Sequence, residues 1–148
     1  MKALRLGTAV VFALSASSPI LAGQAEKEIV HGYVEKVVNG REFDRIDEFV
    51  ATDLKQHNPN LPNGLEPLKG FWEQFLSELP EARFESVRMI SEGEFVVDHS
   101  VFYPVEGALG VAVVDIYRVV DGKIVQHWDI FKPIEEPFAS GNHPVYPD

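Results

Sequence analysis

A chain of 148 residues is long enough for one domain with a proper core, and its net charge of −10 argues against nucleic-acid or anionic-membrane partners. It contains no cysteine, which excludes a disulfide framework and a lipid-attached cysteine. The sequence has no glycine-rich phosphate loop and no nucleophile elbow, so we expect no cofactor.

Residues 1–25 have the pattern of a secretory signal peptide. Lys2 and Arg5 precede an apolar run over residues 9–16, and small residues allow cleavage after Ala22 or Ala25. The run is too short to span a bilayer. We therefore expect a periplasmic or secreted protein that has no membrane contact after cleavage. The alternative, an amphipathic first helix, is disfavoured because no carboxylate precedes Glu26.

Three helices are predicted in the first half of the remaining chain. Apolar residues recur every three or four positions over residues 26–38, until Asn39-Gly40 ends the pattern. A second, short helix is predicted over residues 42–50, and a short strand over residues 54–58. The third helix covers residues 65–79 and ends at Pro80.

Everything after Pro80 has the alternation of a sheet. Strands are predicted over residues 84–90, 95–103, 109–120 and 123–133, separated by glycine, proline or charged turns. Helices followed by an antiparallel run of strands make an α+β domain over residues 26–134. The tail, residues 135–148, contains three prolines and should be irregular. It lies over the mouth of a pocket or frays, and we expect it to fray.

The last two strands form a hairpin around Asp121-Gly122, and its register decides which side chains meet. In a two-residue loop, Asp115 shares a face with Trp128. In a three-residue loop with Gly122 in a bulge, Val119 faces Lys123. We favour the bulged loop, because one face then collects Ile116, Arg118, Gln126 and Trp128, a mixture that suits a partly wet or subunit-contacting surface. The inner face then carries Val113, Asp115, Tyr117, Val125, His127 and Asp129.

The ionisable residues of this inner face are the main candidates for catalysis. A buried carboxylate such as Asp115 stays protonated or finds a partner. His127 and Asp129 point the same way, so they can act as a base and its orienting carboxylate, or share work with Asp115. The structural alternatives are a buried hydrogen bond for Asp115, a backbone contact for His127 and a solvated Asp129.

His99 is the alternative base. In VVDHSVFY it alternates with Asp98, and we expect the face of His99 and its aliphatic neighbours to line the cavity. Asn58 forms the turn before Pro59 or, if it lines the pocket, orients a substrate oxygen. His57, on the other side of the chain, contributes to substrate binding or packs beneath the third helix. The histidines lack the close local spacing of zinc ligands, so we expect no metal.

Aromatic side chains, among them Trp72 and Phe131, fill the core or line a cavity. A cavity with an aromatic lining and a few polar groups suits a small hydrophobic carbonyl compound. On the opposite face of the sheet, Ile116, Trp128 and Ile130 would form an apolar surface, which is typical of a homodimer.

The motifs QHNPNLPNG (residues 56–64) and DIYRVVDGKIVQHWD (residues 115–129), with this order of elements, resemble the SnoaL-like polyketide cyclase family of the NTF2-like superfold. The resemblance covers nearly the whole chain after the signal peptide. It implies a strongly curved, mainly antiparallel sheet wrapped around three N-terminal helices to make a conical pocket. The superfold hosts many activities, so the resemblance specifies fold more closely than function.

The ketosteroid isomerases of the same superfold suggest roles for individual residues. Tyr33 falls at their tyrosine and Asp115 at their protonated aspartate, which together hold an oxyanion. Asn58 falls at their proton-moving aspartate, and an amide cannot abstract a proton. His127, with Asp129 behind it, is then our first choice as the base.

The convergence of ionisable residues on one face, together with the resemblance, favours a cofactor-free enzyme that moves a proton next to a carbonyl, in an isomerisation, dehydration or aldol-type cyclisation. The alternative function is a non-catalytic periplasmic module that binds a small apolar molecule without turning it over. The amide at Asn58 and the export signal favour this alternative.

Overall fold

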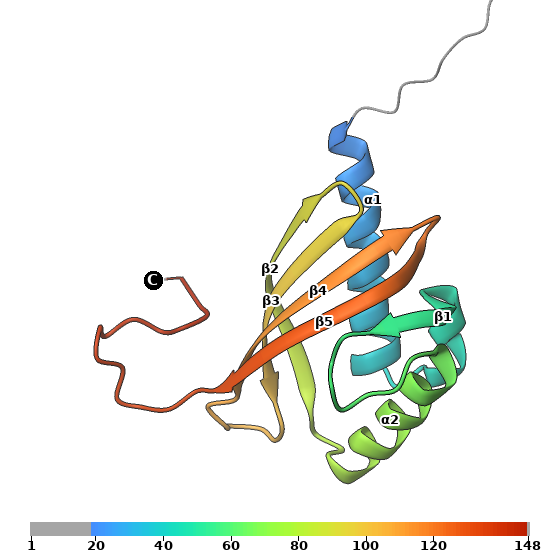
Figure 1. The fold of residues 1–148 in the computed structure, drawn as a ribbon. Coiled ribbons are helices and arrows are strands. Elements are labelled where there is room, and N and C mark those ends of the chain that lie inside the picture. The colour runs from blue at the N-terminus through green and yellow to red at the C-terminus, as the bar shows by residue number, and fades with distance from the viewer. Residues whose placement is uncertain (1–18, 148) are drawn as a thin grey trace, which may run out of the picture.

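The computed structural model describes residues 19–147, in which helices pack against the concave face of one curved sheet (Figure 1). The predicted α+β fold is confirmed. The helices are α1 (Pro19–Gly32), the π-helical η1 (Tyr33–Asn39) that continues it, the 3-10 helix η2 (Phe43–Glu48) and α2 (Leu65–Glu78). The strands are β1 (Val50–Gln56), β2 (Arg83–Glu92), β3 (Phe95–Tyr103), β4 (Val111–Val120) and β5 (Lys123–Pro133).

Most of the predicted signal peptide, residues 1–18, lies outside the described residues. Both predicted cleavage positions, after Ala22 and after Ala25, fall within α1. From residue 19 to residue 147, no helix is both long and apolar enough to cross a membrane.

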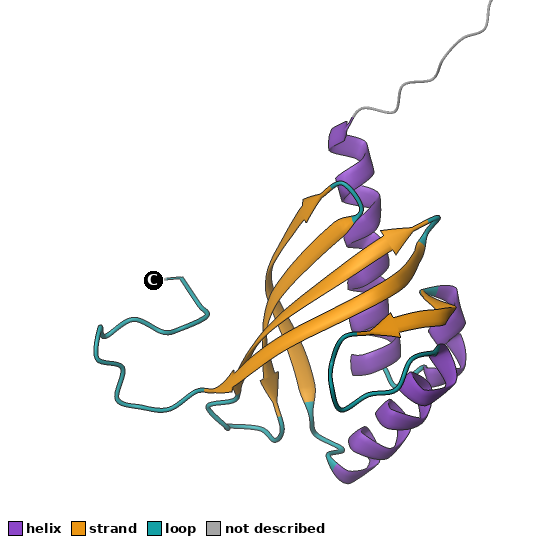
Figure 2. Cartoon of the chain, in the orientation of Figure 1, coloured by secondary structure: helices purple, strands orange, loops and turns teal. Residues whose placement is uncertain are grey.

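The sheet has the strand order β1-β5-β4-β3-β2, and β1 is the only strand that pairs in parallel within residues 19–147. β1 begins earlier than predicted, at Val50, and ends at Gln56, so His57 and Asn58 lie just beyond the strand. Figure 2 shows the helices together on one side of the sheet. Buried residues from the helices and from the inner face of the sheet form the main core, including Val30, Val37, Leu54, Val96 and Ile124.

The hairpin between β4 and β5 differs from the prediction at its loop. Val120 pairs with Lys123, and Asp121 and Gly122 both have positive φ, 50° and 74°, so the loop has two residues with type I′ geometry. The irregularity lies on β5 instead, where Val125 is the extra residue between the pairs Val119–Ile124 and Arg118–Gln126.

This bulge restores the predicted faces. Without it, the two-residue loop would place Asp115 and Trp128 on the same side of the sheet. With it, Asp115 pairs with Asp129 and Tyr117 pairs with His127. The inner face therefore carries the predicted ionisable residues, although Ile124, which is 2% exposed, takes the core position expected for Val125.

The C-terminal tail is irregular, as predicted, but it packs against the outer face of the sheet. Val145 is 1% exposed and joins Val101 and Ile134 in a second core cluster. Arg88 Nη2 donates to the Val145 carbonyl oxygen at 2.6 Å, and the Tyr146 hydroxyl donates to Glu85 Oε1 at 2.7 Å. The expectation that the tail frays is therefore wrong, because its apolar residues find a partner surface on β2 and β3.

The rest of the outer face carries apolar side chains. Trp128 stacks on the exposed His57 ring with 4.2 Å between the centroids, and Ile130 is 73% exposed. The predicted homodimer through this face stays a prediction.

The docked tail predicts a stability effect. Val145→Ala removes two buried methyl groups, so the free energy of unfolding in urea should fall by about 1 to 2 kcal/mol. Val105→Ala is the matched control, because Val105 is 46% exposed and its truncation should lower the free energy of unfolding only slightly. Equal and small losses in both variants would contradict the packing of the tail.

Candidate functional site

A cavity of about 410 Å³ lies between the inner face of the sheet and the helices η1 and α2. Most of its wall is apolar and aromatic, and it includes Trp72, Phe75 and Phe102. Phe131 also lines it but is 60% exposed. Its polar groups come from η1, β4, β5 and the loop after β1, and they are Tyr33, Asn58, Asn60, Asp115, Tyr117, His127 and Asp129.

Asp115 and His127 form a hydrogen-bonded pair in this wall, with 3.0 Å between Asp115 Oδ1 and His127 Nε2. The other ring nitrogen, Nδ1, lies 2.9 Å from Gln56 Oε1 at the end of β1. An amide oxygen only accepts hydrogen bonds, so Nδ1 carries a hydrogen and Nε2 faces the carboxyl group. A single hydrogen bond therefore joins Oδ1 and Nε2.

Burial raises the pKa of the Asp115 carboxyl above its ordinary value. The hydrogen bond from His127 acts in the opposite direction, and the neighbouring charge of Asp129 adds to the rise. A carboxyl group with a raised pKa holds a proton at a higher pH, which suits a group that both takes up and releases protons.

Asp129 does not contact His127 in the way that was expected. Its Oδ2 accepts a hydrogen bond of 2.7 Å from Asn58 Nδ2, and Asn58 Oδ1 accepts one of 2.8 Å from the backbone N–H of Asn60. The carboxylate bonded to His127 is Asp115. The expectation that Asp129 stands behind His127 as its orienting carboxylate is therefore wrong.

Two tyrosines bring hydroxyl groups to the same cavity. The indole N–H of Trp72 donates to the Tyr33 hydroxyl oxygen at 2.6 Å, which leaves the Tyr33 proton free to be donated elsewhere. The ring of Tyr117 meets Tyr33 edge to face at 6.2 Å and stacks on His127 at 5.0 Å. Burial raises the pKa of both phenols well above their ordinary value, so both remain neutral donors.

The structure places two predicted residues away from the cavity. His99 lies on the outer face, because its neighbour Asp98 pairs with Asp115 on the inner face. The expectation that His99 lines the cavity is wrong. The outer face of β3 carries apolar residues that pack against the tail. In the sequence, these residues give the same pattern as a cavity wall. His57 is exposed and stacks on Trp128, so its expected substrate contact and its alternative place beneath the third helix are both wrong.

Two residues of the inner face were not singled out from the sequence. Gln56 shares its side of the chain with Asn58, a signal that could have placed it in the site. Asp98 is 1% exposed, and its Oδ2 accepts a 2.6 Å hydrogen bond from Ser86. Asp98 would have been predicted as a site residue if the face of β3 opposite to His99 had been taken as the inner face.

The cluster also contains the donor types of a metal site. One ligand atom each from Asp115, His127 and Asp129 lies within 4.8 Å of the others. In the structure, however, His127 Nε2 is hydrogen-bonded to Asp115 and the Asp129 carboxylate to Asn58. These contacts describe a hydrogen-bonded cluster, and the expected absence of a metal stays a prediction.

Comparison with known proteins gives consistent results. Residues 30–127 match the model of a family described as the SnoaL-like domain. The Aspergillus niger protein named "Probable cyclase otaY" is 33% identical over 90 residues, which cover 60% of this chain and 73% of that protein.

Solved structures show the same fold at low sequence identity. A SnoaL-like polyketide cyclase from Agrobacterium tumefaciens has a TM-score of 0.62 at 19% identity, with 72% of this chain and 91% of that chain covered. A candidate ketosteroid isomerase from Kribbella flavida has a TM-score of 0.65 at 18% identity, with 85% and 91% covered.

The Asn58–Asp129 contact can be tested by changing one atom type. Asn58→Asp replaces the donating amide with a second carboxylate, so the free energy of unfolding at pH 7.5 should fall by about 2 kcal/mol. The difference from the wild type should shrink toward pH 4, where a carboxyl group can be protonated and donate in place of the amide.

The neighbouring Asn60→Asp is the control, because the Asn60 side chain is exposed and donates to no described residue. Urea denaturation at both pH values gives the measurement. If the free energy of unfolding of Asn58→Asp falls by the same amount at both pH values, the proposed role of the Asn58–Asp129 hydrogen bond is contradicted.

Proposed function

Because the chain belongs to the SnoaL-like family, we propose that it is a cofactor-free enzyme that moves a proton next to a carbonyl group of a small hydrophobic compound. The reaction would be an isomerisation, a dehydration or an aldol-type cyclisation. The observation that carries the proposal is the hydrogen-bonded Asp115–His127 pair in the wall of an apolar cavity.

In this proposal, the group that meets the substrate is Asp115. Both ring nitrogens of His127 are engaged, one by Gln56 and one by Asp115, so His127 acts through Asp115. Asp115 Oδ2 accepts no hydrogen bond from residues 19–147, and the side chain lines the cavity. This reverses the roles inferred from the sequence, in which His127 was the base and Asp115 held the oxygen.

The proton transfer would begin with Asp115 ionised and His127 protonated. Asp115 Oδ2 takes the proton from the carbon next to the carbonyl, and the electron pair of that bond moves onto the carbonyl oxygen. Asp115 then returns the proton to a different atom, or the enolate closes a ring first and Asp115 protonates the resulting alkoxide. The imidazolium of His127 stabilises the carboxylate at the start and at the end of the cycle.

The developing negative charge on oxygen would be held by the two tyrosines. Tyr33 and Tyr117 offer neutral hydroxyl groups in a cavity with a mostly apolar wall, where each hydrogen bond is stronger than in water. The bond from Trp72 polarises the Tyr33 hydroxyl further. Asp129, held by Asn58, keeps negative charge next to Asp115 and so keeps Asp115 basic.

We also propose export, from the pattern of residues 1–25 alone. Expression in a bacterial host would give a mature chain beginning at residue 23 or 26, as read from its intact mass.

The proposed reaction can be detected without knowing the complete substrate. A panel of small hydrophobic ketones and enones is incubated in D2O, and mass spectrometry measures deuterium uptake next to the carbonyl. Asp115→Asn and His127→Ala should each lower the exchange rate by about 100-fold or more. Tyr33→Phe should lower it by about 10-fold to 100-fold, because one oxyanion donor is lost.

Matched controls separate chemistry from folding. His99→Ala and Asp53→Asn make the same changes on the outer face and at an exposed site on β1, and should exchange at the wild-type rate. A ligand that binds to the wild type and is recovered without deuterium would overturn the proposal and favour a binding module.

A further inference from the structure

Three carboxyl groups lie side by side across the inner face of the sheet. Asp98 on β3 pairs with Asp115 on β4, and Asp115 pairs with Asp129 on β5. Directly opposite residues on antiparallel strands have Cβ atoms about 4.5 to 5.5 Å apart, so neighbouring charges in this row interact strongly. The proposed mechanism uses Asp115 and Asp129 and leaves Asp98 unexplained.

Asp98 is the least exposed of the three carboxyl groups. It is 1% exposed, and its Oδ2 accepts a hydrogen bond from Ser86 Oγ. Its Oδ1 has no hydrogen-bond partner within residues 19–147, and neither has the hydroxyl of Ser100, two positions along the same face. A carboxyl group so placed is poorly stabilised in its charged form.

The charge state of Asp98 responds to several neighbours. Burial raises its pKa to about 6, Asp115 on β4 and Glu35 on η1 add to the rise, and Ser86 on β2 and His31 on α1 oppose it. Asp115 is thus the carboxyl on a neighbouring strand that acts most strongly on Asp98.

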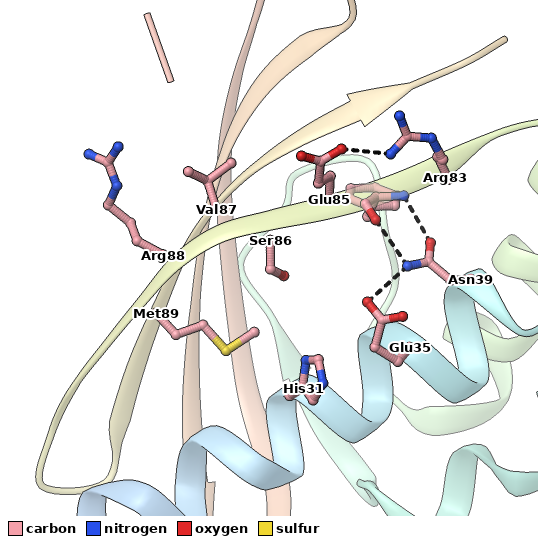
Figure 3. A pocket seen from close by; sticks show the side chains of 10 residues that line it. His31, Glu35, Asn39, Arg83, Glu85, Ser86, Val87, Arg88 and Met89 are labelled. Atoms are coloured by element: carbon pink, nitrogen blue, oxygen red, sulfur yellow. Dashed lines mark hydrogen bonds and ion pairs between the residues drawn. The ribbon is translucent and has the colours of Figure 1, made fainter. Parts of the chain in front are cut away.

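Ser86 connects Asp98 to a second opening in the molecule. A groove of about 510 Å³ runs between β2 and the helices α1 and η1, and Ser86 lines it. Figure 3 shows Ser86 and Met89 directed toward the helix, while Val87 and Arg88 are directed away. Asp98 therefore lies between this groove and the main cavity, one hydrogen bond from a group on the groove wall.

We propose that Asp98 is a positioning residue of the acid–base site, which shares one negative charge with Asp115 across β3 and β4 and reaches solvent through Ser86. Ionisation of either carboxyl then opposes ionisation of the other, so the proton affinity of Asp115 depends on whether Asp98 carries a charge. Its consequence for turnover rests on the proposed function, whereas the coupling itself does not.

The coupling can be measured without a substrate, by 13C NMR titration of the aspartate carboxyl groups. In Asp115→Asn, the titration midpoint of Asp98 should move to lower pH by about 1 unit, because a neighbouring negative charge is lost. In the wild type, the Asp115 signal should show a second inflection at the pH where Asp98 titrates, and this inflection should disappear in Asp98→Asn. In Ser86→Ala, the midpoint of Asp98 should rise.

The control is Asp53→Asn, which should leave both midpoints in place. An Asp98 midpoint that does not move in Asp115→Asn, or an Asp115 titration curve that is the same in the wild type and in Asp98→Asn, would overturn the proposal. Since two separate variants must agree, misfolding of one does not decide the test. Deuterium exchange reports on the proposed function separately, so the coupling and the proposed function can each fail without the other.

Discussion

The arrangement of the site depends on one extra residue in a strand. A two-residue turn at Asp121-Gly122 sets one alternation of side chains along β5, and the bulge at Val125 reverses it before His127 is reached. Ile124 can therefore enter the core and His127 can face the cavity from the same strand. The cavity wall depends on this bulge, because β5 without it would point either Ile124 or His127 toward the outer face of the sheet.

The row of carboxyl groups on the inner face is chemically useful because hydrogen bonds do not fully offset the cost of burying its charges. The sheet places Asp98, Asp115 and Asp129 next to each other, with His127 as the nearby basic group. In water such carboxyl groups would ionise independently. Beneath the helices, each proton gained or lost changes the free energy of its neighbours, so the row behaves as one acid–base system.

Much of the fold followed from the sequence, because periodicity and turn residues are local signals. The pattern over residues 65–79 and the two runs that became β3 and β5 gave elements close to those observed. The faces of β4 and β5 were predicted from the mixed composition of the outer face, although the loop geometry behind that prediction was different.

The parts that the sequence did not predict depend on distant contacts. The prediction placed His99 on the inner face because its neighbours on the same side are apolar. Those neighbours pack against the tail, which is more than 30 residues away in sequence. Gln56 and Asn58 took their roles from pairing with β5, which no local pattern reveals. Such contacts are specified by tertiary packing, which overrides local alternation.

The docked tail also changes the character of β2. This strand is at the edge of the sheet, a position that usually leaves one row of backbone groups free to pair with another chain. On its outer face, the side chains of Arg88 and Glu85 hold the tail. From the helix side, the Asn39 amide bonds to both the N–H and the carbonyl of Phe84, as a neighbouring strand would. Asn39 thereby occupies one pair of backbone groups that the edge would otherwise offer to another chain.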